Sequence, residues 1–178
     1  MIDMEDLPKR KLHRLQGYDY SKNGYYFVTI CTHERKCILG NVGNAVPGVP
    51  QKTVLTEIGK IVLSAWNKMS EIDPNIKTDW FCIMPNHIHG IIVIKNQPAT
   101  NDEAERRGRR SLQSVVRGFK SAVTREYNKL VPEEKRNKLW QKSFYDEIIR
   151  NQAAYDEISK YIFENPMKWE LDELFINN

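Results

Sequence analysis

The sequence has few cysteines and no long hydrophobic run. Its 178 residues include three cysteines, Cys31, Cys37 and Cys82, an odd number without a C-x-x-C pair. This excludes a disulfide framework and predicts reduced thiols in a cytoplasmic protein. No apolar stretch approaches the ~20 residues of a membrane-spanning helix, and the charged start MIDMEDLPKRKLHRLQ does not resemble a signal peptide. We therefore expect no association with a membrane.

Acidic residues are scarce over one long stretch of the chain. Between residues 106 and 129 a single acid, Glu126, stands among eight basic side chains: Arg106, Arg107, Arg109, Arg110, Arg117, Lys120, Arg125 and Lys129. A positive surface of this kind attracts a polyanion such as nucleic acid. A solvated loop explains the ERRGRR part of this stretch equally well.

The apolar pattern predicts one domain over residues 1–178. Hydrophobic residues make up 40% of the chain, enough for a single core. The spacing of apolar residues predicts these elements: a strand over 24–32, a helix over 54–69, strands over 76–84 and 87–95, a helix starting at Leu112, an extended piece within 139–150 and a helix over 152–164. Segments 40–52 and 96–110 are expected to be loops. An antiparallel sheet covered by helices is an α+β fold, compatible with a ferredoxin-like sandwich.

Two histidines open the apolar segment HIHGIIVIK. In a strand, residues i and i+2 point to the same face, so His87 and His89 project together. Two neutral imidazoles side by side can bind one divalent cation if a third ligand comes from elsewhere in the fold. The alternative is that both are polar residues on the exposed face of a strand. Burying such a pair without partners would be costly, which favours the metal interpretation.

A nucleophile for such a site has to be sought among the late tyrosines. In ISKYIFENPMKW, Tyr161 and Asn165 are four residues apart and share one helix face. They offer a phenol as nucleophile and an amide oxygen as third metal ligand. However, Pro166 disfavours helical geometry at Asn165. Tyr161 also continues the apolar stripe of Ile158 and Ile162, which is typical of a core tyrosine.

Five segments together resemble the single-tyrosine transposases of the HUH nuclease superfamily, in particular the REP-associated tyrosine transposases. They are RLQGYDYSKNGYYFVTICT, MPNHIHGIIVI, LQSVVRGFKSAVTREYN, LWQKSFYDEIIRN and YIFENPMKW. They span most of the chain in the family's order. The resemblance implies a ferredoxin-like fold with metal ligands His87 and His89, completed by Asn165, and with Tyr161 as nucleophile. The metal would be Mg²⁺ or Mn²⁺.

The resemblance also implies a substrate and a reaction. Family members bind single-stranded or hairpin DNA and cleave it to a 5′-phosphotyrosine link and a free 3′-hydroxyl. A phenol, with an ordinary pKa near ~10, needs a nearby cation for this chemistry at neutral pH. We expect the protein to act as a monomer or homodimer.

Candidate DNA contacts follow from charge and aromaticity. Phosphate contacts are expected from Arg106, Arg107, Arg109, Arg110, Arg117 and Lys120. Arg150, Trp140 and Tyr145 can pair or stack with nucleotides, although core packing explains the two aromatic residues equally well. We expect residues 1–24 to form an arm on the DNA and residues 166–178 to form a C-terminal tail.

Two other functions stay open. The first is a nucleic-acid-binding module that keeps the fold without catalysis, which needs no set of His87, His89, Tyr161 and Asn165. The second is a Zn²⁺ hydrolase of a small substrate, for which the sequence offers no recognisable carboxylate ligand near the histidines. If Tyr161 is not the nucleophile, Tyr127 is the next candidate.

Overall fold

A computed structural model describes residues 15–42, 53–96 and 110–176. Arg106, Arg107 and Arg109 lie outside the described residues, as does the predicted arm up to residue 14. In the described ranges, no helix has the length and apolar character needed to span a membrane.

Four strands form the central sheet, and a separate pair forms a small second sheet. The strands are β1 (Gly24–Cys31), β2 (Gly40–Val42), β3 (Thr53–Leu55), β4 (Ile76–Ile83), β5 (His87–Ile94) and β6 (Tyr145–Ile149). The helices are α1 (Glu57–Ile72), α3 (Leu112–Leu130) and α4 (Gln152–Glu164), with short 3-10 helices at His33–Arg35, Glu133–Lys135 and Asn165–Leu171. The central sheet has the order β4-β5-β1-β6, and each neighbouring pair is antiparallel. This confirms the predicted α+β, ferredoxin-like arrangement.

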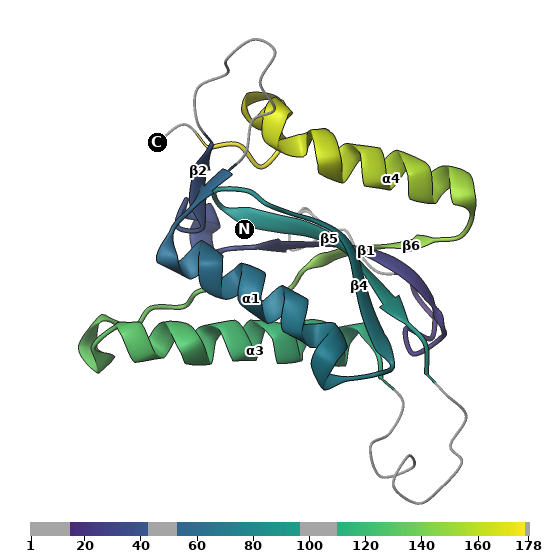
Figure 1. The fold of residues 1–178 in the computed structure, drawn as a ribbon, viewed down its shortest axis with the longest axis horizontal. Coiled ribbons are helices and arrows are strands. Elements are labelled where there is room, and N and C mark those ends of the chain that lie inside the picture. The colour runs from purple at the N-terminus through teal and green to yellow at the C-terminus, as the bar shows by residue number, and fades with distance from the viewer. Residues whose placement is uncertain (1–14, 43–52, 97–109, 177–178) are drawn as a thin grey trace, which may run out of the picture.

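Helices cover both faces of the central sheet. Figure 1 shows α4 above the sheet and α1 with α3 below it. All eight residues of β5 are buried, so alternate side chains enter different layers. Ile88 and Ile92 belong to the larger core with α1 and α3, whereas Ile91 and Val93 pack with Ile162 of α4. Alternate residues of a strand point to the same face, so His87 and His89 lie on the same side of β5 as Ile91. This is the face that α4 covers.

The prediction for residues 40–55 was wrong in two places. Residues 40–42 were expected to be part of a loop, but they form β2. This strand pairs with β3, whose residues 54 and 55 were expected to begin the helix. The helix begins only at Glu57, because the Thr56 hydroxyl accepts a hydrogen bond from the Gly59 N–H at 3.1 Å and caps the helix. Val54 fits the helical spacing by coincidence, since it is 70% exposed in β3.

The end of α4 keeps its helical path through the proline. Asn165 has φ −55° and ψ −45°, and its N–H bonds the Tyr161 carbonyl. Pro166 occupies the first turn of the 3-10 helix Asn165–Leu171, where a missing N–H costs little. The distortion expected at Asn165 is therefore absent, and Tyr161 and Asn165 stay one turn apart.

Residues 15–23 of the predicted arm lie against the body of the protein. Tyr20 is 7% exposed and belongs to the larger core. Its carbonyl accepts the Leu112 N–H at 3.0 Å at the start of α3. This part of the chain is therefore anchored before β1 begins.

Candidate metal site and neighbouring cleft

The sheet and the turn before β5 hold the two histidine rings. Both rings are buried, with exposures of 0% for His87 and 2% for His89. Nδ1 of His87 lies 2.7 Å from Oδ1 of Asn86, and Nδ1 of His89 lies 2.8 Å from the Thr29 hydroxyl on the neighbouring strand β1. Each ring therefore has an outer partner that fixes its orientation, and its Nε2 faces inward.

The two Nε2 atoms lie 2.9 Å apart. The Asn86 amide donates to the Leu174 carbonyl at 2.8 Å, so its Oδ1 faces His87 and can only accept. His87 must then carry its proton on Nδ1 and present a lone pair at Nε2. The Thr29 hydroxyl can donate or accept, so His89 can take either tautomer. When His89 donates to Thr29, both Nε2 lone pairs point at the same place.

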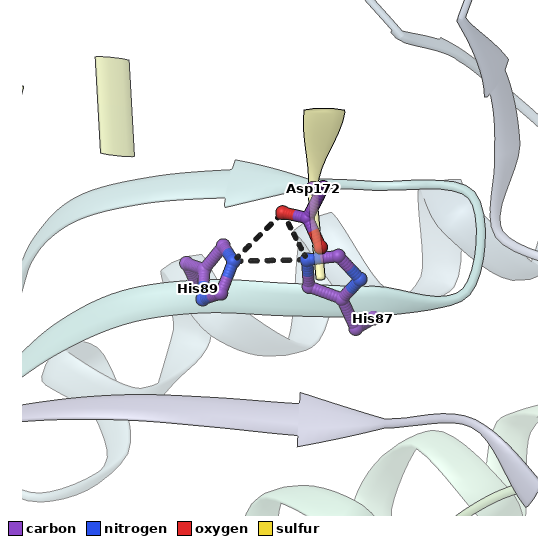
Figure 2. Close-up of side chains that lie close together, drawn as sticks. All are labelled: His87, His89 and Asp172. Atoms are coloured by element: carbon purple, nitrogen blue, oxygen red, sulfur yellow. Dashed lines mark hydrogen bonds and ion pairs between the residues drawn. The ribbon is translucent and has the colours of Figure 1, made fainter. Parts of the chain in front are cut away.

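A carboxylate from the C-terminal segment completes this group. Oδ2 of Asp172 lies 3.8 Å from Nε2 of His87 and 4.0 Å from Nε2 of His89, as Figure 2 shows. The Leu174 N–H donates to Oδ1 of Asp172 at 2.6 Å, and the Asn165 amide donates to Oδ2 at 3.0 Å. The ligand atoms of these two histidines and the aspartate all lie within 4.8 Å of one another, so the group can hold a metal ion.

The environment sets the protonation that metal binding requires. Burial lowers the pKa of His87 well below its usual value, and the adjacent His89 lowers it further. Burial also lowers the pKa of His89. For Asp172, burial acts to raise the pKa, but the contacts with His89 and His87 outweigh it and bring the value to about 2. At neutral pH we therefore expect two neutral imidazoles beside one ionised carboxylate, which is the state that binds a cation.

Tyr161 approaches this group from α4. Its hydroxyl lies 3.3 Å from Nε2 of His89, and its ring contacts Phe27 edge-on with centroids 6.0 Å apart. The side chain is 45% exposed, so Tyr161 is not the fully enclosed core residue of the alternative interpretation. Burial, followed by the charge of Asp172, raises the pKa of Tyr161 to about 12. Without a cation nearby, the phenol is thus further from ionisation than an ordinary tyrosine.

Asn165 lies beside the same group. Its side chain is 4% exposed, and its Oδ1 is buried without a hydrogen-bond partner among the described residues. A buried acceptor without a donor is costly, and a cation beside it would satisfy it. The group that can hold a metal consists of two imidazole nitrogens and one carboxylate oxygen, donors that suit a divalent metal.

A cleft of about 810 Å³ opens next to Tyr161. Its floor includes Phe27, Thr29 and Tyr145 of the sheet, and its walls come from α4 and from the segment before β6. The lining is acidic, with the carboxylates of Glu147, Glu157, Glu164, Asp172 and Glu173. The surface beside Tyr161 is therefore not the basic surface that the sequence suggests for nucleic-acid binding.

The predicted DNA contacts are not gathered at this cleft. Arg110 pairs with Asp73 and bonds Asn96, beyond the end of β5 opposite to His87. Arg117 is exposed on α3, in the layer on the other face of the sheet. Arg150 is exposed after β6, next to the strand end that pairs with the start of β1.

Lys120 has a structural contact that the sequence does not reveal. From α3, its ammonium group donates to the carbonyls of Gln141 and Ser143, each at 3.0 Å. It therefore holds the segment that forms one wall of the cleft. Trp140, in the same segment, is 9% exposed and belongs to the core, whereas Tyr145 is 43% exposed. Tyr127 packs against the larger core, away from the histidines.

Sequence reasoning missed Asp172. It is separated from His87 by nearly half of the chain and fits no ligand spacing. The available signal was weak: the acidic segment WELDELF, which is separated from the YIFENP stretch by Met167 and Lys168. The three further acids that line the cleft from β6 and α4 were missed for the same reason.

Comparison with known proteins places these features in context. A family model described as "Transposase IS200 like" matches residues 20–165. An uncharacterised protein of Haemophilus influenzae is 32% identical over 181 residues, covering 94% of this chain and 94% of the relative. A second protein of that organism, provisionally named a REP-associated tyrosine transposase, is 26% identical over 150 residues, covering 84% of this chain and 74% of its own length. The solved structure of a REP-associated tyrosine transposase bound to a REP hairpin has a TM-score of 0.58 at 21% identity, covering 87% of this chain and 73% of that one.

Proposed function

Because this chain belongs to the IS200-like transposase family, we propose that it is a metal-dependent DNA nuclease and strand-transferase that uses Tyr161 as its nucleophile. We propose single-stranded or hairpin DNA as its substrate, because the structural relative is bound to a REP hairpin. The observation that carries the proposal is the Tyr161 hydroxyl 3.3 Å from His89, at the edge of a group that can hold a metal.

His87, His89 and Asp172 would hold the metal, with the unpartnered oxygen of Asn165 as a further ligand. We propose Mg²⁺ or Mn²⁺ as the metal used for DNA cleavage. When bound, a divalent cation would offset the charge of Asp172, favour the phenolate and stabilise the charge that develops on the scissile phosphate. The outer contacts from Asn86 and Thr29 would keep both imidazoles in the orientation required.

Tyr161 would carry the covalent step. Its phenol loses a proton, and its oxygen forms a bond to the scissile phosphorus while the bond from phosphorus to the 3′ oxygen breaks. The 3′ oxygen takes up a proton and leaves as a free hydroxyl. The number of phosphate ester bonds is unchanged, so a 3′-hydroxyl can reverse the step or redirect it to a new end without ATP.

A binding module without catalysis is the alternative. Such a module has no need for a hydroxyl next to buried histidines, nor for an ionised carboxylate buried beside them. The Zn²⁺ hydrolase gains a carboxylate ligand in Asp172, but the family match favours DNA as the substrate.

The proposal predicts that Tyr161→Phe abolishes covalent protein–DNA adducts, because no oxygen is left to attack phosphorus. The test incubates protein and Mn²⁺ with a labelled pool of DNA hairpins carrying random single-stranded flanks, and detects adducts by denaturing electrophoresis. Binding of the pool, measured by gel shift, should change little.

Tyr127→Phe is the matched control and should form the adduct normally. An adduct that persists in Tyr161→Phe would show that another residue is the nucleophile. If the wild-type protein binds hairpins yet forms no adduct, the binding-module alternative is correct.

A further inference from the structure

The turn that follows β1 has an unusual backbone. Glu34 and Arg35 have φ angles of 56° and 54°, in the left-handed region that residues other than glycine rarely adopt. Across these two residues, the Lys36 N–H donates to the His33 carbonyl at 3.3 Å, as in a type I′ turn. Glycine, asparagine and aspartate are the usual residues at such positions, and this turn has a glutamate and an arginine there. The surrounding structure must therefore impose this conformation.

The turn is anchored to the metal group, which consists of His87, His89 and Asp172. The Thr32 N–H donates to the Asn86 carbonyl at 2.9 Å, and the Thr32 hydroxyl donates to the same oxygen at 2.9 Å. Asn86 in turn contacts the His87 ring through its Oδ1 at 2.7 Å. Because Thr32 directly precedes the turn, the backbone of the turn has a fixed position relative to the metal group.

The side chain of Arg35 carries an unpaired charge beside this group. It is exposed, and its guanidinium group makes no ion pair with another residue in the described part of the chain. Glu34, the one acid of residues 32–36, pairs with Lys36 at 2.9 Å instead. Burial lowers the pKa of His87, and the charge of Arg35 acts in the same direction. Burial raises the pKa of Cys31, and the charge of Arg35 opposes this. The field of Arg35 thus reaches the end of the sheet where His87 lies.

The segment beside the turn adds charges of the same sign. The His33 N–H donates to the Leu139 carbonyl at 2.9 Å, so residues 138–142 run alongside the turn. This segment carries Lys138 and Lys142, which are both exposed. The lining of the acidic cleft includes neither of these lysines, nor the arginine of the turn. A phosphate group is therefore attracted to this surface and repelled by the cleft.

We propose that Arg35 binds a phosphate group of the DNA strand where the strand passes the metal group. A guanidinium group presents a planar fork of donors that fits two phosphate oxygens. Such a contact fixes the position of the strand and reads no base. It supplies the positive contact that the acidic cleft beside Tyr161 lacks. This inference rests on the proposed function, because it takes DNA as the substrate.

The test measures binding of a fluorescein-labelled pool of DNA hairpins with single-stranded flanks by fluorescence anisotropy. It is done at several KCl concentrations and without a divalent metal, so that no cleavage occurs. Arg35→Ala should weaken binding by at least about three-fold at low salt, because a charge-assisted contact is lost. It should also reduce the slope of the logarithm of affinity against the logarithm of salt concentration by about 0.7–0.9, the value for one phosphate contact. Loss of a purely structural contact would leave this slope unchanged in a folded protein.

Arg35→Gly and Glu34→Gly form a matched pair, because glycine adopts a positive φ without strain at either position. Neither variant should lower the melting temperature. Arg35→Gly should lose affinity and salt dependence as Arg35→Ala does, whereas Glu34→Gly should retain the affinity or raise it. Arg35→Lys should keep the salt dependence with a lower affinity, since an ammonium group keeps the charge without the fork.

Lys68→Ala is the control for charge, because it removes an exposed cation from α1, in the layer on the other face of the sheet. It should bind the pool as the wild type does. A folded Arg35→Ala protein with the affinity and salt dependence of the wild type would overturn the inference, as would an equal loss in Lys68→Ala. Either result is compatible with adduct formation through Tyr161, which would leave the proposed function standing. Conversely, binding that depends on Arg35 would support the inference even if no adduct forms.

Discussion

Asp172 presents its two carboxylate oxygens to different partners. Oδ1 accepts the Leu174 N–H, and Oδ2 faces the histidines and the Asn165 amide. The contact with the Leu174 N–H fixes the carboxylate within its own turn of chain. Oδ2 is thereby held facing the two histidines, although Asp172 itself lies outside the regular helices and strands.

We predict that Asp172→Asn weakens Mn²⁺ binding by at least about ten-fold, because an amide oxygen lacks the charge that a hard cation prefers. Titration followed by electron paramagnetic resonance of free Mn²⁺ measures the affinity. Glu173→Gln, the adjacent cleft carboxylate outside the ligand group, is the control and should bind normally. Unchanged affinity in Asp172→Asn would leave Asn165 as the third ligand.

At the scale of elements, α1 packs onto β5 through a glycine. Trp66 of α1 is 2% exposed and stacks on Phe81 of β4, with ring centroids 4.2 Å apart. Its indole reaches the backbone of Gly90, where an added Cβ would lie 2.4 Å from the ring. Gly90 directly follows His89, so this close approach on one face of β5 supports the strand that presents the histidines on the other.

We predict that Gly90→Ala destabilises the fold by about 1–3 kcal/mol, because the added methyl group must displace a buried indole. Urea unfolding measures the change. Gly118 of α3 is the matched control, since an added Cβ meets nothing within 4 Å there. Gly118→Ala should stabilise by about 0.5–1 kcal/mol through helix propensity. An unchanged free energy of unfolding in Gly90→Ala would mean that α1 can shift away from β5 without loss of stability.

At the scale of the whole molecule, the site depends on segments far apart in the chain. The histidines open β5, Tyr161 belongs to the end of α4, and Asp172 lies beyond the last 3-10 helix. An unfolded chain cannot hold these ligands together. Binding of a metal by this group would therefore be coupled to the integrity of the fold.

We predict that Mn²⁺ raises the melting temperature of the wild-type protein. At 100 times its dissociation constant, a ligand that binds the folded state alone adds about 2.7 kcal/mol, equivalent to roughly 5–10 °C in a chain of this size. Differential scanning calorimetry with and without Mn²⁺ measures the shift. His87→Ala should lose most of the shift, whatever its own starting stability. An equal shift in that variant would place the ion elsewhere.

Local patterns in the sequence determined most of the fold. The alternation around β1, the apolar run of β5 and the helical spacing of Gln152–Glu164 are short-range properties, and each element formed where it was expected. The shared face of His87 and His89 follows from the two-residue period of a strand. The exception, Val54 in β3, shows that short apolar runs do not distinguish a strand from a helix.

Tertiary structure alone decided which side chains contact one another. Asp172 joins the histidines, Arg110 turns to Asp73, and Lys120 holds the wall of the cleft. The acidic lining arises in the same way, from carboxylates on β6, α4 and the C-terminal segment. Spacing along a chain predicts which side chains share a face, but it does not predict which faces meet. The packing of distant segments decides which faces meet. It thereby also decides the charge of the surface next to Tyr161.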